Sequence, residues 1–313
     1  MKLGVDPKVD YAFKRLFGRT ENRLLLIDVI NAVLAPKRGA EVVEVELLNP
    51  FNEKDLEDDK LSIVDVKARD QSGRHYNIEM QMLPDRYFCK RLLYYWGKLH
   101  TQQLHEGDPY EELKCTIVIA FVDDPVFPRE AAHHHAFTIR DETNRLIFSD
   151  DFAAHILEIG KFSKRAGELQ STLDTWLYFL KNAESLETTK LPAELKRPAI
   201  ERAVRELTMV TQADLDRERY EARLKLQRDE LSRLRSAKLD GLEEGLEKGR
   251  AEGRAESIVE SILVFCQLLR RPKRKEDLAG LSVEELQALH DQLKTDVASA
   301  LARAQANGNG ANK

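Results

Sequence analysis

Residues 61–82 read LSIVDVKARDQSGRHYNIEMQM, in which two runs of alternating side chains flank a short loop at 71–73. Gly73 provides the residue that tolerates a positive φ in a hairpin loop of this kind. If Asp70 pairs with Arg74 across the loop, counting sets the register of an antiparallel hairpin. One face of the hairpin is then apolar and is expected to pack on a core. That face carries Val64, Val66, Ala68, Tyr76, Ile78, Met80 and Met82.

The opposite face of the predicted hairpin is polar. It carries Asp65, Lys67 and Arg69 on one strand and His75, Asn77, Glu79 and Gln81 on the other. In this register Asp65 lies opposite Glu79, and like charges placed directly across a strand pair repel each other. The pair therefore favours a divalent cation, with Lys67 and Gln81 one side-chain step along each strand, as in a phosphodiester-cleaving site. The alternative is the water-facing side of an ordinary amphipathic hairpin.

The composition is that of a soluble globular chain with room for two domains. Of 313 residues, 33% are charged and 42% hydrophobic. The formal net charge of −5 offers no global attraction to nucleic acid, so a nucleic-acid site would have to be a local basic patch. The cysteines, Cys89, Cys115 and Cys266, lack the spacing of a disulfide framework or a zinc site. We expect a cytoplasmic location and no membrane partner, because neither a signal-peptide core nor a membrane-length apolar run is present.

Apolar periodicity predicts alternating helices and strands along the first part of the chain. A helix is expected from Asp6, as N-cap, and Pro7 to Gly18, and a mostly buried helix from Thr20 to residue 34. Residues 115–122, CTIVIAFV, form an apolar run typical of a strand buried on both faces of a mixed or parallel sheet. Further strands are predicted at 42–48, 137–139 and 155–159, and further helices at 86–104 and 168–186.

Two clusters of metal-ligand residue types are interpreted as structural. Glu57-Asp58-Asp59 lies in a polar stretch before the hairpin, which favours an exposed loop over a metal site. The run His133-His134-His135 cannot place more than two side chains on one face of a strand, and no acidic partner nearby has zinc-site spacing.

The order of these elements predicts an α/β domain at residues 1–185, a mixed sheet flanked by helices. Residues 186–256 are expected to form a linker and a charged segment, in which positions 216–256 hold 11 acidic and 11 basic side chains. Such dense mixed charge with regularly placed leucines is typical of a long solvated helix or a coiled coil. The equal balance of charge argues against a nucleic-acid-binding stripe there.

The remaining C-terminal part is predicted to be helical. Gly241, Gly245, Gly249 and Gly253 recur every four residues, which indicates either close contact between helices or partial helicity, because each glycine costs a helix about 1 kcal/mol. Residues 257–305 are expected to form a small helical region, with a capping box at Ser282 and Glu285. The tail at 306–313 is expected to be disordered.

Several of these segments, in this order, resemble a family of recombination-promoting nucleases and transposases within the PD-(D/E)XK nuclease superfamily. The matching segments are DYAFKRLF at 10–17, ELLNPFN at 46–52, SIVDVKARDQSGRHYNIEMQ at 62–81, KRLLYYWGKLHTQQLHEGDPYEELK at 90–114 and CTIVIAFVD at 115–123. The resemblance covers about the first 185 residues. It implies a restriction-endonuclease-like α/β fold, followed here by an α-helical C-terminal extension, and Mg²⁺-dependent DNA cleavage, with Mn²⁺ as an alternative ion.

The resemblance also implies roles for individual residues. Asp65 and Glu79 would be metal ligands, with the backbone carbonyl of Met80 as a third. Gln81 occupies the position where the superfamily usually has lysine, and its amide would orient the attacking water. The missing positive charge would come from Lys67 or Lys90. Asp10, on the first helix, could also touch the site, but solvation on the helix surface is the favoured interpretation.

Two functions are therefore expected to compete. The first is a Mg²⁺-dependent DNA endonuclease linked to recombination or transposition. The second is a catalytically weak or inactive protein that binds DNA or oligomerises, which Gln81 and the acidic net charge both allow. In either case, we expect a homodimer or homo-oligomer formed through the C-terminal helical segment.

Overall fold

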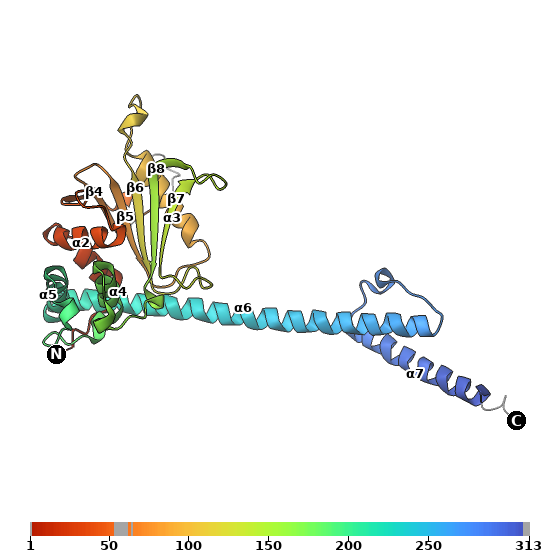
Figure 1. Ribbon diagram of the computed structural model, residues 1–313. Helices are drawn as coiled ribbons and strands as arrows, with labels where there is room; N and C mark the ends of the chain where they lie inside the picture. Colours follow the sequence, from red (N-terminus) through yellow and green to blue (C-terminus); the bar gives the residue numbers. More distant parts are fainter. Residues whose placement is uncertain (1, 53–61, 64, 309–313) are drawn as a thin grey trace. The chain divides into compact units, whose positions relative to one another are not determined.

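The structure is a computed structural model that describes residues 2–52, 62–63 and 65–308 (Figure 1). The chain divides into two compact units, Met1–Glu230 and Leu231–Lys313. The acidic cluster at 57–59 and Val64 lie outside the described residues. None of the described helices is long and apolar enough to cross a membrane.

A mixed six-stranded sheet forms the centre of the first unit (Figure 1). Its strands lie in the order β1 (Val45–Leu47), β4 (Val66–Asp70), β5 (His75–Gln81), β6 (Thr116–Val122), β8 (Ile147–Glu158) and β7 (His134–Arg140). The β1–β4, β4–β5 and β7–β8 pairs are antiparallel, whereas β5–β6 and β6–β8 are parallel. A separate pair joins β2 (Phe51–Asn52) to β3 (Ser62–Ile63). The predicted mixed α/β sheet is confirmed.

The β4–β5 hairpin has the register that was counted from the sequence. Val66 lies opposite Ile78 and Arg69 opposite His75. The loop is closed by the Asp70 amide, which donates to the Arg74 carbonyl at 3.0 Å, and Gly73 has a φ of +84°. The predicted apolar face is buried over Val66, Ala68, Tyr76, Ile78 and Met80.

Helices α1 (Asp10–Phe17), α2 (Arg23–Leu34), α4 (Thr172–Asn182) and α5 (Pro198–Gln212) cover this apolar face. Phe17 and Trp176 are fully buried there, with ring centroids 5.5 Å apart. The predicted start of the first helix at Asp6 is wrong. The Asp6 side chain accepts from the Lys8 amide, and its own amide donates to the hydroxyl of Tyr220, so a tertiary contact holds Asp6 in a turn before the helix.

Helix α3 (Phe88–Thr101) covers part of the other face of the sheet. Phe88 and Leu92 pack on Val118 and Ala120 of β6, so that every residue of β6 is buried, as predicted. Asn77, on the polar face of the hairpin, is fully buried. The polar face is therefore partly enclosed by protein, unlike the face of an ordinary amphipathic hairpin.

Strands β7 and β8 are longer than the segments predicted at 137–139 and 155–159. Ser149 and the acidic residues that follow it interrupt the apolar pattern. Strand β8 includes them because it pairs with β7 on both sides of an irregularity there, at Ser149 and from Ala153 onward, whereas its pairing with β6 begins at Phe152. The histidine run enters β7, where Nε2 of His134 lies 3.0 Å from Nδ1 of His155. Nε2 of His135 lies 3.2 Å from Oε2 of Glu158.

The first unit extends beyond the boundary expected near residue 185. Ile200 and Leu207 of α5 are buried in its core, and so is Tyr220 of α6 (Asp214–Leu268). Short 3₁₀ turns connect the main elements. They are η1 (Thr20–Asn22), η2 (Tyr110–Glu112), η3 (Ile159–Lys161), η4 (Ala166–Glu168), η5 (Ala183–Ser185) and η6 (Ala193–Leu195).

The second unit contains most of α6, the turn η7 (Lys275–Leu278) and α7 (Val283–Gly308). Its own small core is Ile258, Val259, Ile262, Cys266, Leu278, Leu286 and Leu293. The predicted capping box is confirmed, because the Glu285 amide donates to Oγ of Ser282 at 3.2 Å and the Ser282 amide donates to Glu285 at 2.7 Å. Helix α7 includes residues 306–308, and residues 309–313 lie outside the described residues, so the disordered tail stays a prediction.

Candidate active site

A cavity of about 410 Å³ lies at the end of the hairpin where the sequence places its candidate residues. Asp65, Glu79, Met80 and Gln81 all line it. Other elements complete its wall. They contribute Asp10 from α1, Arg91 and Tyr95 from α3, and Arg223, Leu226, Gln227 and Glu230 from α6. The cavity therefore brings together four of the predicted site residues with residues distant in the sequence.

Asp65 is held just before β4 begins at Val66. Its side chain is only 15% exposed, and Oδ2 accepts a hydrogen bond from the Met80 amide at 2.9 Å. Burial raises the pKa of Asp65 to about 6, although the Met80 hydrogen bond and the charge of Lys14 oppose the shift. The ionised carboxylate is therefore poorly stabilised by the protein alone.

Glu79 lies opposite Asp65 when the β4–β5 register is continued by one pair. Burial, followed by the negative charge of Asp65, raises the pKa of Glu79 well above its usual value. Its Oε1 atom is buried and has no hydrogen-bond partner among the described residues. A buried carboxylate oxygen without a partner costs free energy. The two carboxylates therefore fit a divalent cation, whose charge would stabilise both ionised groups.

The backbone offers an oxygen atom at the position of the third ligand that the family resemblance implies. The Gln81 carbonyl accepts from the Asp123 amide, on the β6 side of β5. Neighbouring carbonyls along a strand point in opposite directions, so the Met80 carbonyl is directed toward the β4 side, where Asp65 lies. Within the described residues, no three His, Cys, Asp or Glu side chains gather closely enough to bind a metal. A site here would therefore combine two carboxylates with a backbone oxygen.

Lys14 and Arg91 supply positive charge close to the carboxylates. Nζ of Lys14 lies 2.7 Å from Asp10 and 3.3 Å from Oδ1 of Asp65. The hydrogen bond to Asp10 and the charge of Asp65 raise the pKa of Lys14, against the effect of burial. Nη2 of Arg91 donates to Oε1 of Gln81 at 3.2 Å. Neither cation was a candidate from the sequence.

The two lysines expected to supply this charge lie elsewhere. Nζ of Lys67 donates to Gln102, beyond the end of α3, at 3.0 Å. Lys90 is exposed, with its Nζ 5.9 Å from the centre of the Tyr87 ring. Neither residue is among those that line the cavity. Lys14 does not line it either, but its Nζ lies 3.3 Å from Oδ1 of Asp65. Arg91 follows Lys90 directly, and the rotation of about 100° per helical residue turns it toward the site.

The Gln81 amide is held at both ends. Its Nε2 donates to the Leu83 carbonyl at 3.1 Å, and its Oε1 accepts from Arg91. This pair of contacts fixes the orientation of the amide at the cavity wall. Gln81 therefore contacts the guanidinium of Arg91 at the wall of the cavity.

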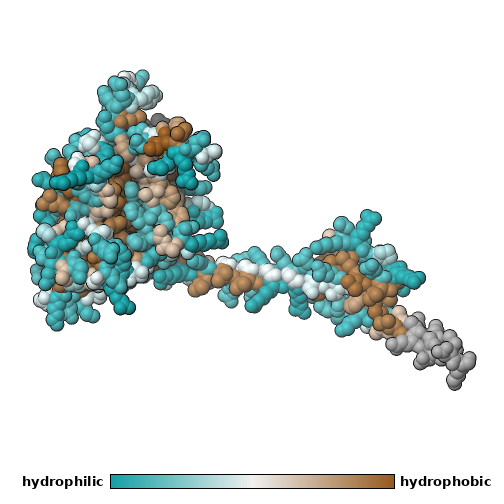
Figure 2. Space-filling view, viewed as in Figure 1, coloured by the Kyte–Doolittle hydropathy of each residue, from teal (hydrophilic) through white to brown (hydrophobic). Residues whose placement is uncertain are grey.

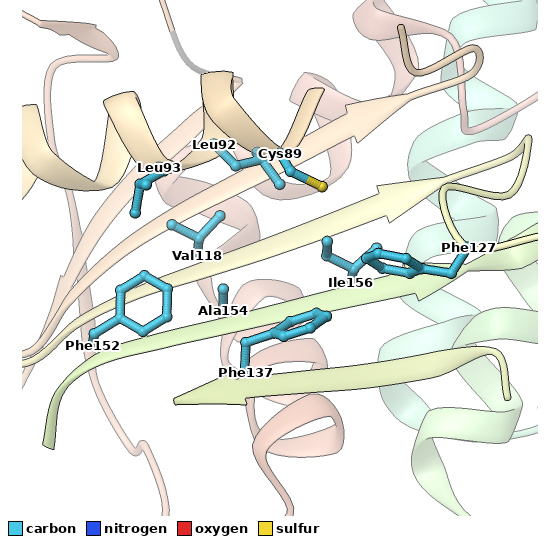
Figure 3. A pocket seen from close by; sticks show the side chains of 9 residues that line it. All are labelled: Cys89, Leu92, Leu93, Val118, Phe127, Phe137, Phe152, Ala154 and Ile156. Atoms are coloured by element: carbon cyan, nitrogen blue, oxygen red, sulfur yellow. The ribbon is translucent and has the colours of Figure 1, made fainter. Parts of the chain in front are cut away.

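A second cavity, of about 310 Å³, has a different chemical character (Figure 3). The side chains that line it are Cys89, Leu92, Leu93, Val118, Phe127, Phe137, Phe152, Ala154 and Ile156. Burial raises the pKa of the Cys89 thiol, which makes it a poorer nucleophile. The lining offers no acid–base pair and no metal ligand set, so the carboxylate cavity remains the candidate active site.

Residues 7–237 match the family model described as PD-(D/E)XK nuclease family transposase. The chain belongs to this family. Comparison with curated proteins and with solved structures finds no match. Family membership indicates a nuclease or transposase-like role with DNA as the substrate, and nucleases of this superfamily generally use divalent metals. The matched region includes α5 and the start of α6, as the first compact unit does.

Proposed function

We propose that this family member is a metal-dependent DNA endonuclease that hydrolyses phosphodiester bonds during recombination or transposition. Asp65, Glu79 and the Met80 carbonyl would hold Mg²⁺, with Mn²⁺ as an alternative ion. The observation that carries the proposal is the buried Oε1 atom of Glu79, which has no hydrogen-bond partner among the described residues and whose side chain lines the same cavity as Asp65. Lys14 of α1 brings a positive charge to these two carboxylates, with its Nζ 3.3 Å from Oδ1 of Asp65.

The residues around the carboxylates have distinct roles in the proposed reaction. A bound divalent cation supplies charge stabilisation at the scissile phosphate and a water of lowered pKa. Lys14 holds Asp65 in place and stabilises negative charge that develops on the phosphate. The Gln81 amide, oriented by Arg91, positions the attacking water. Arg91 therefore acts through Gln81 as a positioning residue.

A cleavage assay tests the proposal directly. Supercoiled plasmid is incubated with the full-length chain in Mg²⁺, in Mn²⁺ and in EDTA, and the nicked and linear products are measured. We expect products with either metal and none with EDTA. Products of equal amount in EDTA would show that the carboxylate pair is not a metal site for hydrolysis.

Lys14, rather than Lys67 or Lys90, is expected to supply the catalytic positive charge. Lys14→Gln should reduce the rate of plasmid nicking by about 10²-fold, the usual effect of losing one preorganised charge donor. Lys67→Gln and Lys90→Gln remove the same charge farther from the carboxylates and should have much smaller effects. If Lys67→Gln or Lys90→Gln reduces the nicking rate more than Lys14→Gln does, that lysine supplies the catalytic charge and the assignment to Lys14 is wrong. Thermal unfolding of each variant checks that the fold is intact.

We also propose that the second unit joins two copies of the chain. Leu239, Leu242 and Leu246 recur at helical spacing on α6 and are 65%, 59% and 53% exposed, and Figure 2 shows apolar side chains on the surface of this helix. No described atom outside the helix lies within 4 Å of a Cβ built at any of the four repeated glycines. The equal numbers of acidic and basic side chains make this helix complementary to a second copy of itself.

Replacing Leu239, Leu242 and Leu246 with glutamine is expected to convert the dimer to a monomer. Burial of these three side chains against a second copy would be lost, and light scattering would report a mass close to 35.9 kDa. The same substitutions leave the first unit untouched. A wild-type mass that equals the monomer and does not change with concentration would instead contradict the proposed dimer, while leaving the nuclease proposal standing.

A further inference from the structure

A third cavity, of about 320 Å³, lies between α1 and the first turns of α6, beside the carboxylate cavity. The two cavities share Asp10 and Arg223 in their walls. Four cations line this one, namely Lys14, Arg15, Arg19 and Arg223, and Asp10 is the acidic residue among its described lining. A cavity that favours a cation thus adjoins a cavity that favours an anion.

Two of these four cations are already neutralised by protein carboxylates. Lys14 pairs with Asp10 and Asp65, and the buried Arg15 pairs with Asp216. Arg19 and Arg223 are both exposed, and neither forms an ion pair or a side-chain hydrogen bond with any residue that the structure describes. Arg19 is close enough to Asp216 for its charge to help lower the pKa of that carboxyl, but Asp216 is already paired with Arg15. The capacity of the cavity to bind an anion therefore resides in these two arginines.

The start of α6 is anchored on α1, which fixes the position of Arg223. The Tyr220 hydroxyl accepts a hydrogen bond from the Asp6 amide at 2.8 Å, and the Tyr220 side chain is only 5% exposed. The Tyr11 hydroxyl donates to Asp216, the same carboxylate that pairs with Arg15. Arg223 lies less than one turn after Tyr220, so this part of α6 is a firmly placed wall of the first unit.

We propose that Arg19 and Arg223 bind a DNA backbone phosphate next to the scissile one. The phosphates of a nucleic-acid strand are a regular series of anions, so a strand with one phosphate at the carboxylate cavity presents its neighbour to an adjoining basic cavity. Paired guanidinium groups suit this ligand because their planar donors match phosphate oxygens. The position next to the scissile bond rests on the proposed nuclease function, whereas phosphate binding itself does not.

This assignment changes the expected role of the charged helix. The equal charge balance of residues 216–256 argues against a nucleic-acid-binding stripe along the whole segment. In the tertiary structure, Arg223 near the start of this segment lines the same cavity as Arg19, which precedes α2 in the sequence. The local charge at the cavity, and not the average over the helix, determines the binding.

The test compares two double variants that remove the same charge. The double variant Arg19→Gln, Arg223→Gln removes from the cavity wall the two cations that are not neutralised by ion pairs. Arg23→Gln with Arg228→Gln is the matched control, because both residues are exposed arginines on α2 and α6 that do not line the cavity. Fluorescence anisotropy with a labelled DNA duplex, in EDTA and over a range of salt concentrations, gives Kd and its salt dependence for each full-length protein.

We expect the cavity variant to bind DNA on the order of tenfold more weakly, as for the loss of a charged hydrogen bond. The slope of log K against log salt should become shallower by about 0.9, for one phosphate contact. The control variant should retain the wild-type slope. Arg19→Lys with Arg223→Lys keeps the charge and should recover most of the slope but not all of the affinity.

Equal losses in the cavity and control variants would overturn the proposal, because general positive charge would then explain the binding. An unchanged Kd in the cavity variant would also overturn it. Because the binding measurements are made in EDTA and require no cleavage, they are independent of the nuclease assay. If the chain fails to cut DNA but the cavity and control variants differ in Kd and salt slope as expected, the phosphate site is supported. Only its position next to a scissile bond is then contradicted.

Discussion

Glu79→Gln is expected to reduce metal-dependent nicking of plasmid DNA by about 10³-fold or more. The substitution keeps the size of the side chain and removes the charge that the cation needs, so both metal affinity and charge stabilisation at the phosphate are lost. Steady-state nicking rates in Mg²⁺ and Mn²⁺ measure the effect. Glu46→Gln is the matched control, because Glu46 lies on β1, pairs with Arg69 and is 60% exposed.

The same variant has a second expected effect, on stability. In the metal-free protein, burial and the charge of Asp65 raise the pKa of Glu79, whereas the unfolded chain ionises this carboxyl freely at neutral pH. Glu79 therefore destabilises the folded state above its unfolded pKa. Glu79→Gln should therefore raise the Tm of the metal-free protein by several °C. It should also abolish the rise in Tm that Mg²⁺ or Mn²⁺ gives the wild type through binding to the native state. A Glu79→Gln variant whose Tm in EDTA is lower than that of the wild type would contradict the proposed site. A variant whose Tm still rises with Mg²⁺ or Mn²⁺ would also contradict it.

Asp70→Ala is expected to reduce the free energy of unfolding by about 3–5 kcal/mol, the usual cost of removing one partner from a buried ionic network. The Asp70 side chain is fully buried and accepts hydrogen bonds from Ser72, Arg74 and Tyr76. These hydrogen bonds hold its pKa below the usual value, although burial raises it. The alanine variant would leave the buried Tyr76 hydroxyl without its acceptor. Urea denaturation measures the change.

A double-mutant cycle separates this network from simple loss of packing. Tyr76→Phe alone should cost only about 1 kcal/mol, since Asp70 retains its other donors. The two substitutions together should cost less than the sum of the single effects, because the unpaired hydroxyl is then absent. Additive effects would mean that Asp70 does not stabilise the hairpin through Tyr76. Because the network closes the β4–β5 turn, it also supports the register that places Asp65 opposite Glu79.

Local sequence patterns were enough to predict the centre of the first unit. A period of two residues identified the hairpin, and one glycine in its loop set the register, because a shift of one residue would turn every apolar side chain to the wrong face. The uninterrupted apolar run at 115–122 identified β6, since only a strand covered on both faces has this composition. These features depend on neighbours within a few residues, and the structure confirms them.

Contacts between distant segments could not be read in the same way. Lys14 lies off the apolar stripe of α1, and nothing local distinguishes it from a solvated lysine until the fold places it next to Asp65. Arg91 and Lys90 are adjacent cations, and only the rotation of α3 against the sheet decides which one meets Gln81. Asp6 has the features of a helix N-cap, but its contact with Tyr220, more than 200 residues away, keeps it out of the helix.

The sequence by itself determined the hairpin, the pairing of Asp65 with Glu79 and the α/β class of the fold. These follow from side-chain periodicity and from the conformational freedom of a turn glycine, which are properties of short segments. Only the tertiary structure decided which cations approach the carboxylates, and that the start of the charged helix lines the same cavity. Those outcomes depend on how buried helices rotate to cover the sheet, and this is set by the packing of residues far apart in the chain.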